Sequence, residues 1–300
     1  TFGATQSTGD RLEQIKEFLR LEKEMLHRYH QKGDSGLRLT RARAVIMDVL
    51  IQTLFKWAIF VANESMGGSK PMCLLATGGY GRGELSPHSD IDLMFLYSRS
   101  SIGKPLDNLK EIMTREILYP LWDAGLKVGH ASREIKEALT ESQKDIRNKN
   151  SMLDARFVCG DRKISKKFID SFFKFCRKNQ PAQYLNELLK HQLERRDGKG
   201  NTVFLQAPDV KNGVGGLRDF QGILWMAKVK FNIENLHGLV GKKYLTEQEA
   251  KSFEDAYSFL LRVRNELHFR SSRPVDVLHL EKQPEIALGL GYPQKDNFPH

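Results

Sequence analysis

The stretch Leu74-Leu-Ala-Thr-Gly-Gly-Tyr-Gly-Arg-Gly-Glu-Leu-Ser-Pro-His-Ser-Asp-Ile-Asp-Leu93 decides how this chain folds. It begins within a short apolar run, Met72 to Thr77, which predicts a buried strand, and it leads into a second predicted strand, Asp90 to Tyr97. Gly78 and Gly79 follow the first strand, and the absence of a Cβ lets their backbone approach a bulky anion closely. The order of strand, glycine pair and strand therefore predicts a phosphate-binding turn.

Two carboxylates stand at the start of the second predicted strand, where one residue separates Asp90 from Asp92. Side chains alternate sides along a strand, so both carboxylates project from one face. Ile91, Leu93 and Phe95 then point the other way, into a core. Two carboxylates beside the N–H groups of a glycine turn suit hard divalent cations that bridge a triphosphate. Either signal alone is common in proteins, and their combination indicates a nucleotide and metal site.

The regions on either side of this stretch have different periodicities. Residues 10–31 and 37–65 show helical spacing and are separated by turn residues at 33–36. After the second strand we expect a helix over 105–123 that frays near Pro120, a third strand over 126–131, and a helix that starts at Glu134. From residue 151 onward strands nearly vanish, and helices are predicted over 151–159, 163–178, 181–196, 216–231 and 246–270.

This pattern predicts an α+β protein with three segments. Residues 1–68 form an N-terminal helical hairpin, residues 69–150 a small catalytic domain with a mixed sheet, and residues 151–300 an all-helical domain that binds nucleotide or substrate. The apolar region 45–62 is interrupted by Asp48, Gln52 and Lys56, which lie four residues apart and form one polar stripe. We interpret it as a core helix and not as a membrane span.

Composition narrows the class of protein. The 300 residues are 40% hydrophobic and 28% charged, as in ordinary globular proteins. The three cysteines, Cys73, Cys159 and Cys176, are widely spaced, which argues against a disulfide framework and a structural zinc site. No signal-peptide pattern is visible at the N-terminus, so we expect a cytoplasmic protein. The net charge of +10 attracts phosphates or acidic surfaces, but aromatic residues do not interleave the basic ones, so nucleic acid is not favoured as a partner.

The glycine–carboxylate stretch resembles the nucleotidyltransferase β superfamily, whose pattern is a strand, Gly-Gly or Gly-Ser, and then Asp-x-Asp. Its full wording is similar to the family of bacterial PII uridylyltransferase/uridylyl-removing enzymes. Further segments also resemble that family, and the resemblance extends over roughly residues 70–292. These segments are Leu121 to His130, Asp209 to Asp219, Phe259 to Arg264 and Leu288 to Tyr292.

The resemblance implies a polymerase β-like fold and a reaction. UMP would pass from UTP to a tyrosine of the PII signalling protein, with release of pyrophosphate. Asp90 and Asp92 would be catalytic and would hold Mg²⁺ or Mn²⁺. The residues that would contact the nucleotide are Gly78, Gly79, Arg82, Ser89, Lys211, Arg218 and Asp219. For Arg82 a surface salt bridge is the alternative, and for the loop around Lys211 a capping device between two helices is the alternative.

Members of the superfamily commonly have a third acid on a later strand, and this chain departs from that pattern. The third predicted strand, Leu126-Lys-Val-Gly-His-Ala131, supplies no carboxylate. His130 could replace it as a ligand, or could be an ordinary half-buried histidine. Asp123 and Glu134 flank the strand, and the sequence does not choose among the three.

Other departures concern activity. Asn212-Gly-Val214 stands where the family has Glu-Gly-Pro, and Ala131 stands where it has serine. No His-Asp dipeptide of the family's hydrolase domain occurs in these residues, so we expect addition of the nucleotide without its removal, and no response to glutamine. Two alternatives stay open at this stage. One is a nucleotidyltransferase with another nucleotide or a small-molecule acceptor, and the other is a non-catalytic nucleotide sensor, which the missing third acid favours.

Overall fold

The computed structural model describes residues 7–66, 71–97, 104–178, 181–198 and 200–293. Within these ranges the strands are β1 (Met72–Ala76), β2 (Ile91–Tyr97), β3 (Val128–Glu134) and β4 (Arg156–Gly160). The helices of the first half are α1 (Thr8–Gln31), α2 (Gly36–Met66), α3 (Gly78–Gly81), α4 (Lys104–Met113), α5 (Tyr119–Asp123), α6 (Ile135–Lys144) and α7 (Ile146–Leu153). Those of the second half are α8 (Arg162–Lys178), α9 (Pro181–Asp197), α10 (Leu217–Phe231), α11 (Leu236–Gly241), α12 (Glu247–Phe269) and α13 (Gln283–Gly289).

Contacts group the chain into two compact units. The first, called here the sheet unit, comprises Thr1–Glu24, Arg41–Leu85 and Ser89–Phe175. The second, the helical unit, comprises Met25–Thr40, Ser86–His88 and Cys176–His300. Helices α1 and α2 therefore contribute to both units, and three residues of the glycine–carboxylate stretch belong to the helical unit. The division into three consecutive segments stays a prediction.

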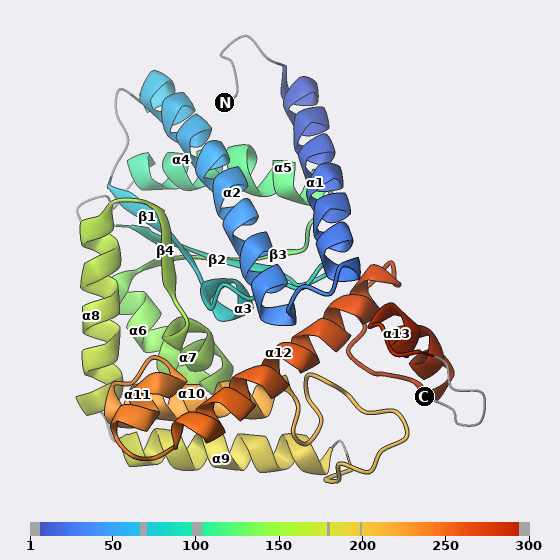
Figure 1. Cartoon of the computed structure of the whole chain (residues 1–300). Helices are drawn as coiled ribbons and strands as arrows, with labels where there is room; N and C mark the ends of the chain where they lie inside the picture. Colours follow the sequence, from blue (N-terminus) through green and yellow to red (C-terminus); the bar gives the residue numbers. More distant parts are fainter. Residues whose placement is uncertain (1–6, 67–70, 98–103, 179–180, 199, 294–300) are drawn as a thin grey trace. The chain divides into compact units, whose positions relative to one another are not determined.

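The sheet unit is built on a mixed sheet with strand order β3-β2-β1-β4. Strand β1 pairs antiparallel with β2 and with β4, whereas β2 pairs parallel with β3. In the first pair Leu74 lies opposite Phe95, and in the parallel pair Asp92 lies opposite Gly129. A mixed sheet with helices packed on it confirms the predicted α+β class (Figure 1).

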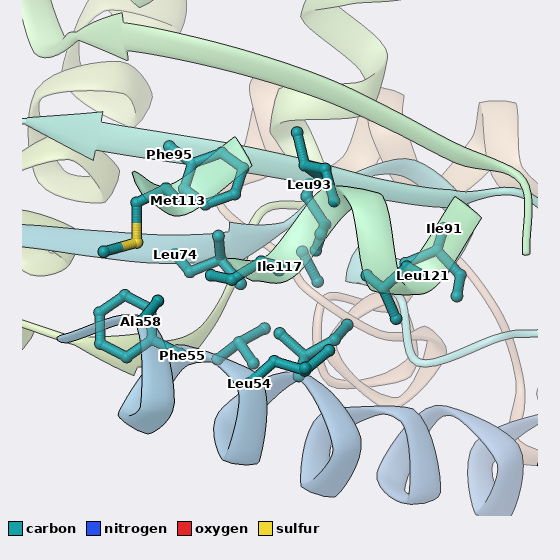
Figure 2. Packing of buried hydrophobic residues seen from close by; sticks show 14 of the residues in the cluster. Leu54, Phe55, Ala58, Leu74, Ile91, Leu93, Phe95, Met113, Ile117 and Leu121 are labelled. Carbon is teal, nitrogen blue, oxygen red and sulfur yellow. The ribbon is translucent and has the colours of Figure 1, made fainter. Parts of the chain in front are cut away.

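The core of the sheet unit lies between the sheet and helices α2, α4 and α5. The alternation predicted for β2 is confirmed, because Ile91, Leu93 and Phe95 are all buried in one hydrophobic cluster. Figure 2 shows these side chains with others of the same cluster: Leu54, Phe55 and Ala58 of α2, Leu74 of β1, and Met113, Ile117 and Leu121 of the segment from α4 to α5. Burial of this much apolar surface fixes where β2 and its carboxylates lie.

The polar stripe of α2 bonds to other elements of the sheet unit. Asp48 accepts hydrogen bonds from the Tyr80 hydroxyl (2.6 Å) and from the Arg156 guanidinium (2.7 Å). The amide nitrogen of Gln52 donates to the carbonyl of Val158 in β4 (3.0 Å). The prediction that this region is a core helix is confirmed on the packed face. Gly36–Ser65 is nevertheless long and apolar enough to cross a membrane by length and composition, and its outer face leaves Val45 and Val49 exposed.

Two local predictions were wrong. Residues 151–159 do not form a helix, since α7 ends at Leu153 and β4 follows and pairs with β1. A short apolar run can belong to a buried strand or to a helix. Here it forms a strand because it pairs with the edge of β1 that β2 leaves open. The helix predicted over 105–123 does not fray near Pro120. It continues through a π-helical turn, Thr114–Leu118, into α5, where Pro120 stands in the first turn and needs no helical N–H donor.

The later helical predictions are confirmed. Segments 163–178, 181–196, 216–231 and 246–270 correspond to α8, α9, α10 and α12. In the helical unit, α10 and α12 pack through three aromatic rings. The ring centroid of Phe220 lies 4.6 Å from that of Phe253 and 5.2 Å from that of Tyr257. A capping box at Thr246 and Glu249 begins α12, and Asn232 in a left-handed conformation ends α10.

The end of β4 gives a test of the sheet. Gly160 has φ +94°, and a Cβ there would lie 2.5 Å from the Met72 carbonyl oxygen. We expect Gly160→Ala to lower the free energy of unfolding by about 1–3 kcal/mol, because it adds a strained backbone and a clash with β1. Urea denaturation measures this. Gly241→Ala is the matched control, since its Cβ would meet nothing within 4 Å and should leave stability nearly unchanged. Equal effects of the two substitutions would contradict the β1–β4 pairing.

Candidate active site

The carboxylate of Asp92 lies in space left by two missing side chains. A Cβ on Gly78 would stand 3.0 Å from its Oδ2, and a Cβ on Gly129 would stand 2.7 Å from its Oδ1. The hydroxyl oxygen of Ser151, on α7, lies 3.4 Å from the same Cβ position on Gly78. Asp92 is therefore held between the start of α3 and strand β3, with the Ser151 hydroxyl close to the same glycine.

The short helix α3 starts directly at this carboxylate. Gly78 has φ +56°, a left-handed conformation that favours glycine. The N–H of Thr77 donates to the Asp92 carbonyl (3.0 Å), and the Thr77 side chain makes no capping hydrogen bond. The first N–H groups of a helix have no intrahelical acceptor, and a phosphate contact by those of Gly78 and Gly79 stays a prediction.

Three contacts hold α3 in place within the sheet unit. The Tyr80 hydroxyl donates to Asp48 (2.6 Å), and burial raises the pKa of this phenol, so it stays protonated as a donor. The Arg156 guanidinium donates both to Asp48 and to the Tyr80 carbonyl (3.3 Å). Gly81 packs against α7 so closely that a Cβ would stand 2.1 Å from the Asp154 carbonyl oxygen. The glycine turn is therefore held firmly in one position within the sheet unit.

Arg82 is engaged by two carboxylates. Its Nε donates to Glu84 (2.9 Å) and one terminal nitrogen donates to Asp154 (2.6 Å), with only 11% of the Arg82 side chain exposed. This is an ion-paired position, which is the alternative considered from the sequence, although here it is mostly buried and not on the surface. A phosphate contact by Arg82 stays a prediction, and it would require the guanidinium to share or exchange these partners.

Of the three residues considered for the place of the third acid, His130 and Glu134 do not share the face of Asp92. In the parallel pair Asp92 lies opposite Gly129, so His130, opposite Leu93, projects from the other face. The His130 ring lies instead 5.7 Å from that of Trp122. Glu134 also lies on the other face, where it forms a capping box for α6, and Asp123 ends α5. A side chain at position 129 would collide with the Asp92 carboxylate.

Ser89 and Asp90 directly precede β2, and the Asp90 side chain is exposed. Among the described residues no group of three or more His, Cys, Asp or Glu side chains is placed to hold a metal ion. The carboxylates of Asp90 and Asp92 nevertheless fit Mg²⁺, which commonly binds one or two protein carboxylates and completes its coordination shell with water and substrate phosphates.

The glycine-rich loop of the helical unit is shaped by two aspartates. The Asp209 carboxylate accepts the N–H groups of Lys211 (3.0 Å) and Asn212 (2.8 Å). Asp219, in the first turn of α10, accepts the Gly215 N–H (2.8 Å) and pairs with Arg195 and Arg196 of α9. These bonds are the capping and turn device considered from the sequence, and nucleotide contacts by Asp219 and Arg218 stay a prediction.

Lys211 belongs to a buried polar cluster at α12. Its Nζ lies 3.4 Å from Asp276, which also accepts the Nε of Arg264 (2.7 Å) and a ring nitrogen of His268 (3.2 Å). Burial and the neighbouring Arg264 lower the pKa of the Lys211 ammonium. The pKa of Asp276 lies well below its usual range despite burial, because His268 and the two cations stabilise the carboxylate. Burial lowers the pKa of His268 to about 4.

The predicted site residues are divided between the two units. Gly78, Gly79, Arg82, Ser89, Asp90 and Asp92 lie in the sheet unit, and Lys211, Arg218 and Asp219 in the helical unit. Sequence reasoning missed Ser151 and the polar frame of Asp48, Arg156 and Asp154. The regular spacing of the α2 stripe was the available signal for Asp48, whereas the contacts of Ser151 and Asp154 join segments far apart in the chain.

Two family models match the chain. The DUF294 nucleotidyltransferase model matches residues 21–128, which contain α3 and both carboxylates. The GlnD PII-uridylyltransferase model matches residues 183–299. Together with the mixed sheet and the glycine–carboxylate geometry, these matches place the chain among the nucleotidyltransferases, which are enzymes.

Within that class the chain resembles one group of bacterial proteins. It is 33% identical, over 99% of its length, to proteins named bifunctional uridylyltransferase/uridylyl-removing enzyme from Phenylobacterium zucineum and Caulobacter vibrioides. A protein of the same name from Bradyrhizobium sp. is 34% identical over 87% of the chain. The resemblance seen in the sequence is confirmed. The chain spans about a third of these relatives, namely 32% of the first two and 28% of the third.

The buried histidine gives a prediction for pH dependence. The pKa of His268 is about 4 in the folded chain and 6.5 without its surroundings, so between these values the unfolded chain binds a proton that the folded chain does not. We therefore expect the free energy of unfolding to fall as pH is lowered through this window. Urea denaturation at several pH values measures the slope, which should be shallower in His268→Asn. An unchanged slope in this variant would contradict the prediction.

Proposed function

We propose that this chain transfers a nucleoside monophosphate from a nucleoside triphosphate to an acceptor hydroxyl, with Asp90 and Asp92 holding Mg²⁺ or Mn²⁺. The observation that carries the proposal is the position of the Asp92 carboxylate between Gly78 and Gly129, at the start of α3. Such a carboxylate beside open N–H groups suits a metal that bridges protein and triphosphate.

Each part of the site has a task in this reaction. The acceptor oxygen bonds to the α-phosphorus, the bond from that phosphorus to the bridging oxygen breaks, and pyrophosphate leaves while the hydroxyl proton passes to solvent. A bound divalent ion would neutralise the triphosphate charge and lower the pKa of the acceptor hydroxyl. Gly78 and Gly79 would donate their N–H groups to phosphate oxygens. Such transfer depends mainly on positioning and charge. The fixed position of α3 is therefore as important as the carboxylates that would bind the metal.

We further propose that the nucleotide is UTP and the acceptor a tyrosine of a PII-type signalling protein. The support is the matched GlnD PII-uridylyltransferase model and the names of the relatives. A tyrosine hydroxyl has a pKa of about 10 in water, so it needs the charge stabilisation described above to react near neutral pH. We also propose nucleotide contacts from Arg82, Ser89, Lys211, Arg218 and Asp219. A cytoplasmic location fits the free cysteines Cys73, Cys159 and Cys176.

A pyrophosphate-release assay tests this function. The chain would be incubated with a PII protein, Mg²⁺ or Mn²⁺, and each of UTP, ATP, GTP and CTP in turn. UTP should give release that depends on both the metal and the acceptor, with UMP attached to a tyrosine by mass spectrometry. Release with another nucleotide alone would replace the uridylyl proposal by another transfer, and absence of release with every nucleotide would overturn both.

The metal-binding carboxylate gives the first prediction for this site. Asp92→Asn should abolish transfer, because the amide removes the negative charge that holds the metal, whereas the fold should be kept. Loss of one of two neighbouring negative charges should leave the melting temperature of the metal-free protein unchanged or raise it. Asp107→Asn, an exposed change on α4, is the matched control and should transfer normally. Near-normal turnover by the Asp92 variant would show that the metal site is elsewhere.

A second prediction tests the position of the carboxylate without changing its charge. The Cβ of Gly129→Ala would stand 2.7 Å from Asp92 Oδ1, so the carboxylate must move aside. We expect kcat/KM to fall by about 10- to 100-fold, since small displacements of catalytic groups have effects of this size. Gly241→Ala serves again as the control for adding a methyl group. Wild-type kinetics in the Gly129 variant would mean that this placement of Asp92 does not matter.

A further inference from the structure

The short segment Ser86–His88 joins α3 to β2, and it leads through Ser89 directly to Asp90. By its contacts it belongs to the helical unit, whereas the residues on both sides of it belong to the sheet unit. Ser86 is fully buried. The backbone that leads into Asp90 is therefore held, two residues earlier in the chain, by contacts within the helical unit.

His268 of α12 is the central contact of this segment. The His88 N–H donates to Nδ1 of the His268 ring (3.2 Å), so Nδ1 must be unprotonated. The other ring nitrogen, Nε2, then carries the hydrogen and donates it to Asp276 Oδ1 (3.2 Å). The ring is completely buried. Both of its nitrogens are used, so His268 links the Asp276 carboxylate to the backbone of His88 and is not a free base or a metal ligand.

The neighbours of His268 hold the same segment at further points. The Arg264 guanidinium donates to Asp276 through Nε (2.7 Å) and to the Ser86 hydroxyl through a terminal nitrogen (3.3 Å). The His88 ring donates through Nε2 to the Ser271 carbonyl (2.9 Å), in the turn after α12. Buried polar networks of this kind allow only one arrangement, because displacement would leave several groups without partners.

We propose that His268 is a positioning residue for nucleotidyl transfer: its neutral ring, oriented by Asp276, holds the backbone of His88, two residues before Asp90 in the chain. This inference rests on the proposed function, in which Asp90 is a metal ligand. Groups that orient a metal ligand from behind typically change metal affinity or activity by about 10- to 100-fold when they are removed.

Two substitutions of His268 separate its two hydrogen bonds. In His268→Asn the amide oxygen occupies the place of Nδ1 and can still accept the His88 N–H, but the bond to Asp276 is lost. In His268→Gln the amide nitrogen can reach Asp276, but no acceptor stands at the place of Nδ1. We expect kcat of the Gln variant to fall by about 10- to 100-fold and its Mn²⁺ requirement to rise, with a much smaller change in the KM for the nucleotide. The Asn variant, which keeps the bond to His88, should lose clearly less activity than the Gln variant.

Circular dichroism and thermal unfolding show whether each variant is folded, and His279→Gln, an exposed histidine of the same unit, is the matched control. Wild-type activity in the Gln variant, or equal losses in folded Asn and Gln variants, would overturn the inference. Should the Gln variant not fold, the ¹⁵N spectrum of the wild-type protein decides: we expect neutral His268 protonated at Nε2, and protonation at Nδ1 would overturn the proposal. A wild-type chain without transferase activity would instead overturn the proposed function, whatever the tautomer.

Discussion

The close approach of the Asp92 carboxylate to two glycine backbones is the constraint on which the rest of the site depends. With a Cβ at Gly78 or Gly129, helix α3 or strand β3 could not lie where it does without displacing this side chain. Gly81 likewise lets the end of α7 pack closely against α3, and Ser151 of α7 lies near Gly78. Glycine here is required by space as much as by backbone conformation. The carboxylate is thereby held at the edge of a packed core, beside the first turn of α3.

Around this constraint the protein uses buried ion pairs as a frame. Asp48, Arg156 and Tyr80 connect α2, β4 and α3, and Arg82 connects the glycine turn to Asp154 at the end of α7. Buried charges cost desolvation free energy, which their partners offset only when the geometry is good. Their advantage is structural specificity, because the paired groups hold the glycine turn at α3 in one position. The helical unit repeats this principle with the cluster around Asp276, which holds the segment that leads into Asp90.

Much of the fold could be predicted from local patterns. The alternation in β2, the helical spacing of α10 and α12, and the turn residues before α2 each depend on neighbours in the sequence. Predictions failed where distant pairing decided. Residues 156–160 are a strand because β1 offers them an edge, and the helix containing Pro120 continues because its apolar face is buried, with Leu121 in the core. A short apolar run does not carry that information by itself.

The site divides in the same way. Local spacing was enough to predict the two glycines, the Asp90–Asp92 pair and the class of chemistry, because these residues are close in the chain and side chains two apart on a strand share a face. The packing of distant segments was needed to show that Arg82 is ion-paired, that Gly129 faces Asp92, and that His268 holds the backbone of His88. Such contacts join residues up to 180 positions apart. They depend on how strands and helices pack, which no local spacing specifies.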